Sequence, residues 1–209
     1  MTVDESMGGF GIAEIHYMLS RFQNQAVAVG AATLQAEYPA ENKDMLLAGA
    51  SSLLARGLLV ADDGENMSPK GLAAATLYAL GNSTRWVSVA FTSPGQGAGV
   101  VYFLNSEVNL MMQGRGLGGW FASAQQADAD LAAGWLEMAT LFAKDNENAA
   151  IIFTATDAHS NLSNVALRTC PGGWEAASGT GSAPTIQIPG VFSDGEVRTL
   201  LAAKLLGKQ

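Results

Sequence analysis

Apolar residues in the first part of the chain recur at helical spacing. From Gly11 onward they fall at i, i+3, i+6, i+7 and i+10, which predicts one buried stripe on a helix of about three turns. Residues 1–9 predict a frayed start, and residues 25–34 fit either a short strand or an alanine-rich helix. The stripe consists of Ile12, Ile15, Met18, Leu19 and Phe22.

Residues 42–80 predict a helix, a strand, a turn and a second helix, in the order of a winged-helix segment. Asn42 is suited to cap a helix over 43–55, and Gly57 stands where a helix can end in a left-handed conformation. Residues 58–60 form a short apolar run, and 62–64 read as a turn. Ser68 and Pro69 then predict the N-cap and first turn of the next helix.

From Arg85 the apolar period changes from about 3.6 to 2, which predicts strands. Short loops between the first four strands favour an antiparallel meander. The predicted strands lie at 86–91, 100–104, 107–112, 117–122, 150–154, 165–169, 173–177 and 184–188. A long helix is predicted over 124–143, and a last helix over 194–206 with Ser193 as its cap.

These elements predict an α/β (α+β) fold with an antiparallel central sheet and flanking helices. The chain is interpreted as a single domain, 1–209, with a winged-helix-like helical part at 10–82 and a sheet-and-helix part at 83–209. Both halves share the same order of elements, a sheet flanked by helices. A pseudo-twofold relation between the halves is therefore a hypothesis, and no residue-level repeat supports it.

The charge pattern disfavours nucleic acid as a partner. The chain has 209 residues, 48% hydrophobic and 14% charged, and a net charge of −8. Residues 1–100 hold nine acids and five bases, and residues 101–209 hold ten acids and six bases, so neither half is basic. A nucleic-acid surface normally clusters Lys and Arg, whereas the bases here are scattered, and the same reasoning disfavours an anionic membrane surface.

The remaining bulk features point to a cytoplasmic protein without a metal or cofactor. The single cysteine, Cys170, rules out an internal disulfide framework and a multi-cysteine metal site. The N-terminus is acidic and lacks the order of a signal peptide. No apolar run reaches the roughly 18 residues that a membrane helix needs. The glycine-rich stretch 95–99 leads into a strand, so it lacks the helix N-terminus that holds a phosphate.

The segment around Arg56 carries the most specific pattern in the chain. It matches an "L-x-ARGL…DG" signature through Leu53, Ala55, Arg56, Gly57, Leu58, Asp63 and Gly64, with Arg85 at the following strand. Over roughly residues 45–92 the chain thereby resembles the EspG family, cytosolic chaperones of type VII secretion. The resemblance implies an α/β fold with quasi-twofold halves, and binding of the helical tip of an export substrate without catalysis.

A group of large apolar residues in the meander is a candidate partner-binding surface. These side chains are adaptable, and an exposed fraction of them would suit a groove for a partner helix. The candidates are Met111, Met112, Trp120 and Phe121. The competing interpretation is that they belong to the core.

The loop 154–160 is the one cluster of catalytic type. His159 is suited to act as a base and Asp157 to orient it. Asp, Ser and Asn also build ordinary turns, so a solvated loop is the competing interpretation.

Three functions therefore stay open. The first is a non-enzymatic protein-binding module, such as a cytosolic secretion chaperone or adaptor for a helical partner. The second is a winged-helix, ligand-responsive transcription regulator, and the third is an enzyme using the 154–160 loop. A protein partner and a homodimer are compatible with the first function. The sequence does not identify the partner or the oligomeric state.

Overall fold

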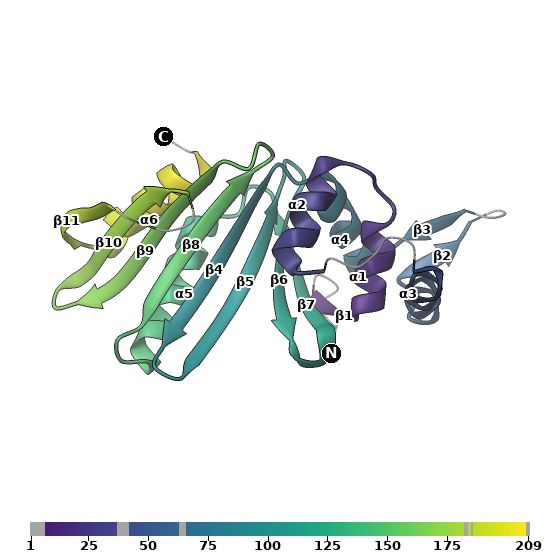
Figure 1. Cartoon of the computed structure of the whole chain (residues 1–209), viewed down its shortest axis with the longest axis horizontal. Helices are drawn as coiled ribbons and strands as arrows, with labels where there is room; N and C mark the ends of the chain where they lie inside the picture. The colour runs from purple at the N-terminus through teal and green to yellow at the C-terminus, as the bar shows by residue number, and fades with distance from the viewer. Residues whose placement is uncertain (1–6, 37–41, 63–65, 182–183, 185, 208–209) are drawn as a thin grey trace. The chain divides into compact units, whose positions relative to one another are not determined.

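Two sets of strands, each with helices against one face, account for most of the structure (Figure 1). The computed structural model describes residues 7–36, 42–62, 66–181, 184 and 186–207. The chain divides into two compact units, Met1–Trp86 with Val101–Ala127, and Val87–Val100 with Asp128–Gln209.

The first unit holds four helices and an antiparallel set of strands in the order β1-β7-β6-β5. Helices α1, α2 and α4 lie over one face of these strands (Figure 1). A separate hairpin, β2–β3, stands between α3 and α4. The elements are β1 (Met7–Phe10), α1 (Ile12–Leu19), α2 (Gln25–Leu34), α3 (Lys43–Ala55), β2 (Leu59–Ala61), β3 (Met67–Pro69), α4 (Gly71–Asn82), the second part of β5 (Gln96–Leu104), β6 (Val108–Arg115) and β7 (Gly119–Gln126).

The second unit holds strands in the order β4-β8-β9-β10-β11, with α5 and α6 on one face (Figure 1). Trp135 of α5 contacts Phe153 of β8 with ring centroids 6.1 Å apart. The elements are most of β4 (Arg85–Ser93), the first part of β5, α5 (Leu131–Asp145), β8 (Ala150–Asp157), β9 (Leu162–Cys170), β10 (Gly173–Thr180), β11 (Ile186–Phe192), α6 (Asp194–Leu201) and a π turn (Ala202–Leu206).

The predicted fold class is confirmed: the protein is α+β with a large antiparallel sheet and flanking helices. The order helix, four strands, helix occurs twice along the chain, as α4-β4-β5-β6-β7-α5 and α5-β8-β9-β10-β11-α6. This repeated order agrees with the hypothesis of related halves. The interpretation of the chain as one domain with two parts, 10–82 and 83–209, stays a prediction.

Several local predictions were wrong. Residues 7–10 form strand β1 instead of a frayed start, because they pair with 120–123 of β7, a partner far along the chain. The long helix begins at Leu131, not at 124, because β7 continues to Gln126 and Asp130 caps the helix by accepting a hydrogen bond from the Ala133 amide. Residues 25–34, ambiguous in sequence, are helical.

Two of the predicted helix caps are confirmed and one is wrong. Asn42 and Ser193 cap their helices through their side chains, as predicted. The prediction for Ser68 and Pro69 was wrong. Pro69 pairs with Leu59 in the β2–β3 hairpin, the Ser68 hydroxyl donates to Asp62, and α4 begins only at Gly71.

Candidate functional site

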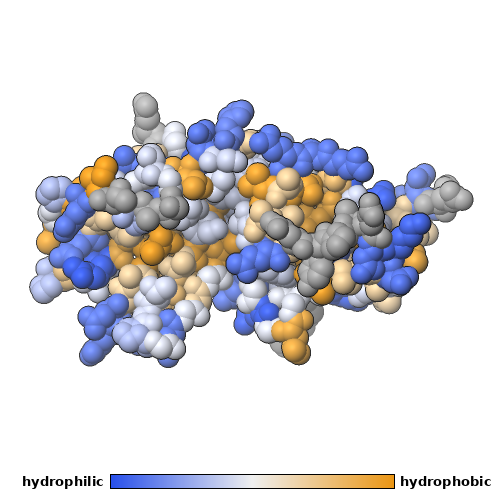
Figure 2. Space-filling model, viewed as in Figure 1, coloured by the Kyte–Doolittle hydropathy of each residue, from blue (hydrophilic) through white to orange (hydrophobic). Residues whose placement is uncertain are grey.

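The strands of the second unit bury one face under α5 and α6 and leave the other without a covering helix from the described residues of that unit (Figure 1). Along β8, side chains alternate between the two faces. Ile151, Phe153 and Ala155 are buried on the helix side, whereas Ala150, Ile152 and Thr154 on the opposite face stay half-exposed. We call this second surface the open face. Figure 2 shows hydrophobic surface over β8, β9 and β10 between hydrophilic regions.

Small apolar side chains line the middle of the open face. Strand pairing places Ile152, Ala166, Ala177 and Gln187 in one row across β8, β9, β10 and β11, and we call this row, with its two central alanines, the alanine row. A hollow of about 360 Å³ lies here, and Ala150, Ala166, Ala177 and Pro184 contribute to its lining. Because alanine projects only a methyl group, a helix laid on this row can approach the backbone of the sheet closely.

An ion pair borders the alanine row. Arg168 donates to Glu175 Oε2 through Nη2 at 2.5 Å and through Nε at 3.1 Å, and the two residues are direct cross-strand neighbours. The hydrogen bond from Arg168 to Glu175 raises the pKa of the guanidinium above its ordinary value. Both side chains retain exposure, so the pair can be rearranged by a partner at little cost.

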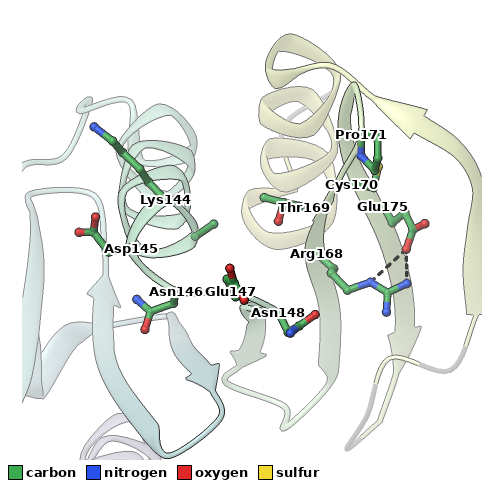
Figure 3. Close-up of a pocket in the computed structure, with 11 residues that line it drawn as sticks. Lys144, Asp145, Asn146, Glu147, Asn148, Arg168, Thr169, Cys170, Pro171 and Glu175 are labelled. Carbon is green, nitrogen blue, oxygen red and sulfur yellow. Dashed lines mark hydrogen bonds and ion pairs between the residues drawn. The ribbon is translucent and has the colours of Figure 1, made fainter.

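A second hollow, of about 650 Å³, lies on the other side of this pair (Figure 3). The end of α5 and the loop 146–148 line one side, and the turn from β9 to β10 lines the other. Its charged residues are of both signs: Lys144 and Arg168 against Asp145, Glu147 and Glu175. A lining of mixed sign does not select an anion or a cation, so the alanine-lined hollow is the better candidate for recognition.

The predicted partner-binding residues belong to the first unit. Met112 has an exposed fraction of 0% and packs in the core. Met111, Trp120 and Phe121 are half-buried on β6 and β7. The strand pairing puts Met111 and Phe121 on one face, because Met111 lies opposite Ser123 and Phe121 opposite Gln113, and puts Trp120 on the other. The structure thus does not gather the four residues into one surface.

The 154–160 loop is organised by Asp157. Its Oδ1 accepts hydrogen bonds from the amides of His159 and Asn161 at 2.8 and 3.0 Å, and its Oδ2 accepts one from Asn161 Nδ2 at 2.9 Å. These bonds lower the pKa of Asp157, with the Asn161 side chain as the largest cause. The carboxylate therefore closes the β8–β9 hairpin, which gives Asp157 a structural role in this turn.

The Arg56 of the signature segment has a structural partner. Its Nη1 lies 2.8 Å from both carboxylate oxygens of Glu14 on α1, and Ser52 Oγ donates to the same carboxylate at 2.7 Å. The Glu14 side chain is 4% exposed and that of Arg56 is 41% exposed. A buried carboxylate needs such partners, since burying it unpaired would cost several kcal/mol.

The same arginine also holds β1. Its Nη2 donates to the Gly9 carbonyl at 2.8 Å, and its guanidinium lies 5.7 Å from the centroid of the Phe10 ring. Gly57 follows Arg56, the C-cap of α3, with φ of 68°, which lets the chain turn back toward β2. The "ARGL" part of the signature thus joins α3, α1 and β1. Its remaining residues, Asp63 and Gly64, lie outside the described residues.

Within the described residues, no group of three or more His, Cys, Asp and Glu side chains is arranged to hold a metal ion. None of the helices described is both long and apolar enough to cross a membrane.

The alanine row was missed in the sequence. Its signal is that strands 150–157 and 162–170 place apolar residues on both faces, whereas a half-exposed strand normally alternates with polar ones. Periodicity cannot say which of two apolar faces is left uncovered.

Comparison with known proteins shows similarity in structure alone. No protein-family model matches the chain, and no curated protein matches its sequence. Among solved structures, the chain is similar to the Mycobacterium tuberculosis type VII secretion system chaperone EspG5, solved in complex with the PE25–PPE41 dimer. The TM-score is 0.60 at 11% identity, with 97% of this chain and 98% of that chain covered. The protein therefore has an EspG5-like fold.

Proposed function

We propose that the protein is a non-enzymatic chaperone or adaptor that binds a helical segment of a protein partner in the cytoplasm. The observation that carries the proposal is the open face, where an alanine row and a hollow lie beside an exposed ion pair. The likeness to EspG5 supports it, because that chaperone was solved with a protein dimer. By analogy, a secretion substrate is the proposed class of partner.

The geometry of the open face suits a helix better than a small molecule. A helix is about 10 Å across with its side chains, and it needs a shallow, apolar floor rather than an enclosed cavity. Ala166 and Ala177 supply the floor, and Arg168 and Glu175 supply polar groups at its edge. Charged groups at the edge of such a surface fix the position and orientation of the bound helix more than they strengthen its binding.

Co-purification of the tagged full-length chain from its native host tests the proposal. We expect one stoichiometric protein partner with the wild type and its loss with Ala166→Arg, which fills the floor with a long charged side chain. Ala203→Arg, at an exposed position of the C-terminal turn, is the matched control and should retain the partner.

Two results would contradict the proposal. A wild-type chain that is recovered alone under these conditions argues against a chaperone or adaptor. A partner that Ala166→Arg retains as well as Ala203→Arg does would move the binding site away from the open face.

A further inference from the structure

The turn between β6 and β7 presents a leucine entirely to solvent. Leu117 has a relative exposure of 107%, the largest among the exposed large hydrophobic residues of the described chain. Figure 2 shows hydrophobic surface at the end of the β6–β7 hairpin. Single exposed leucines are common, so exposure alone carries no argument.

The backbone at Leu117 makes this position unusual. Leu117 adopts φ of 62° and ψ of 28°, the left-handed conformation that glycine and asparagine tolerate and branched side chains avoid. Gly116 and Gly118 stand on either side, so the turn is built mainly from glycine. A leucine whose backbone is left-handed and whose side chain is fully exposed is a reason to look for a role outside the fold itself.

The charge around the turn differs from that of the whole protein. Residues 108–127 contain one base, Arg115, and no acid, whereas the chain carries −8. Arg115 lies over the Phe121 ring at 5.6 Å from its centroid, so the cation stays beside the turn. The complementary surface is therefore an apolar pocket with a carboxylate at its rim.

A protein pocket fits this turn better than a lipid surface does. A single leucine buries much less apolar area than a myristoyl chain, which by itself holds a protein to a bilayer only marginally. The net charge of −8 also opposes approach to anionic lipid. A leucine that is fully buried in a protein pocket, in contrast, gains about 1.5–3 kcal/mol from the apolar surface that it removes from water.

We propose that Leu117 is an anchor residue for a protein partner, inserted into an apolar pocket whose rim carries an acidic residue. The existence of a protein partner rests on the proposed function. The binding site at Leu117 does not, because the turn belongs to the first unit and the open face belongs to the second.

The test compares two exposed leucines of the first unit. Leu117→Asn keeps a side chain of similar size that tolerates the left-handed backbone, and removes only its apolar character. Leu47→Asn on α3, where Leu47 is 65% exposed, is the matched control. With the partner purified from the native host, we expect Leu117→Asn to weaken binding roughly 30-fold, the loss of one buried leucine side chain, and Leu47→Asn to leave it unchanged.

Trp120 reports on the same turn. The chain has four tryptophans, of which Trp86, Trp135 and Trp174 are buried and Trp120 is half-buried three residues from Leu117. We expect the partner to protect part of the tryptophan fluorescence from acrylamide quenching. Trp120→Phe should abolish that protection.

Photocrosslinking in the native host, from a benzophenone residue at position 117 or 47, separates the remaining outcomes. An adduct from 117 that maps to an apolar pocket beside an acid supports the inference, even if Ala166→Arg shows that the open face is not used. No protein adduct, an adduct to a second copy of this chain, or Leu117-dependent binding to phosphatidylcholine vesicles would overturn it. If the wild-type chain co-purifies with no partner, the proposed function is wrong. The photocrosslinking result at position 117 then tests the present inference independently.

Discussion

Each of the two units contains an arginine–glutamate pair, and the two pairs differ in burial. In the first unit, Glu14 is enclosed between α1 and α3 and depends on Arg56, Ser52 and a backbone amide. In the second unit, Arg168 and Glu175 lie on the open face, 64% and 35% exposed. The first pair joins elements far apart in sequence, whereas the second joins neighbouring strands.

The difference shows how each unit uses its polar residues. A buried pair specifies which elements meet, because any other arrangement leaves a charge without a partner. An exposed pair adds little stability, since water competes for both groups. The first unit is thus organised by an internal polar network, and the second keeps its charged groups available to a partner.

The largest expected effect concerns a glycine at the crossing of α1 and α3. A Cβ on Gly49 would lie 2.1 Å from the Ala13 carbonyl oxygen, so the two helices would have to separate. We expect Gly49→Ala to destabilise the protein by about 3 kcal/mol or more, measured by chemical denaturation.

Gly134 of α5 is the matched position in the second unit. Nothing lies within 4 Å of its Cβ position, and it is exposed within a helix. Gly134→Ala should stabilise the protein by about 0.5–1 kcal/mol through helix propensity. Equal effects at Gly49 and Gly134 would contradict the close helix crossing.

The next largest change in stability is expected from breaking the two ion pairs. Arg56→Ala leaves the Glu14 carboxylate buried without its cation, and we expect a loss of about 2–3 kcal/mol, toward the low end for buried pairs because Arg56 is partly exposed. Arg168→Ala should leave the unfolding midpoint unchanged. A comparable loss for both variants would mean that the contrast in burial does not hold.

A smaller effect is expected at the start of α6. Trp174 Nε1 donates to Asp194 Oδ1 at 2.8 Å, and the Trp174 side chain is buried. Asp194→Ala removes the acceptor, so we expect a loss of about 1 kcal/mol. Asp194→Asn keeps an acceptor oxygen and should recover most of it, and thermal melts of the two variants measure the difference.

The smallest expected effect depends on pH and is confined to the first unit. Burial lowers the pKa of His16 below its ordinary value, so the folded protein holds this imidazole neutral. Because the unfolded chain then binds the proton more readily, stability is full above the unfolded pKa of about 6.5 and declines as the pH falls below it. We expect a lower melting temperature at pH 5.5 than at pH 7.5. His16→Gln should reduce this dependence, and His159→Gln, at an exposed position, should not.

The sequence predicted the elements where local signals were strong. Asn42 and Ser193 predicted the starts of their helices, and the alternation of apolar and polar residues after Arg85 predicted the strands. Both signals are local, because caps and periodicity are properties of neighbouring residues. Ser68 failed as a cap because it lies within strand β3, where its hydroxyl donates to Asp62 across the β2–β3 hairpin. The signature around Arg56 led to an EspG-like fold, and the similarity to EspG5 confirms the fold.

The candidate sites were harder to predict. Met112 was chosen for its residue type, and the structure buries it completely, whereas Leu117 of the adjoining turn was overlooked. Whether an apolar side chain is core or surface depends on what packs over it, and residue type does not reveal that. The predicted role of Met111, Trp120 and Phe121 in partner binding stays a prediction.

By itself, the sequence determined most of the helices and strands and the acidic, base-poor composition, because these follow from caps, periodicity and residue content. Only the tertiary structure decided that Glu14 meets Arg56, 42 positions later, that the alanine row is left open, and that Leu117 stands in solvent. The physical reason is that long-range pairing and coverage result from the packing of whole elements, and no local pattern encodes which face of an apolar strand a helix will cover.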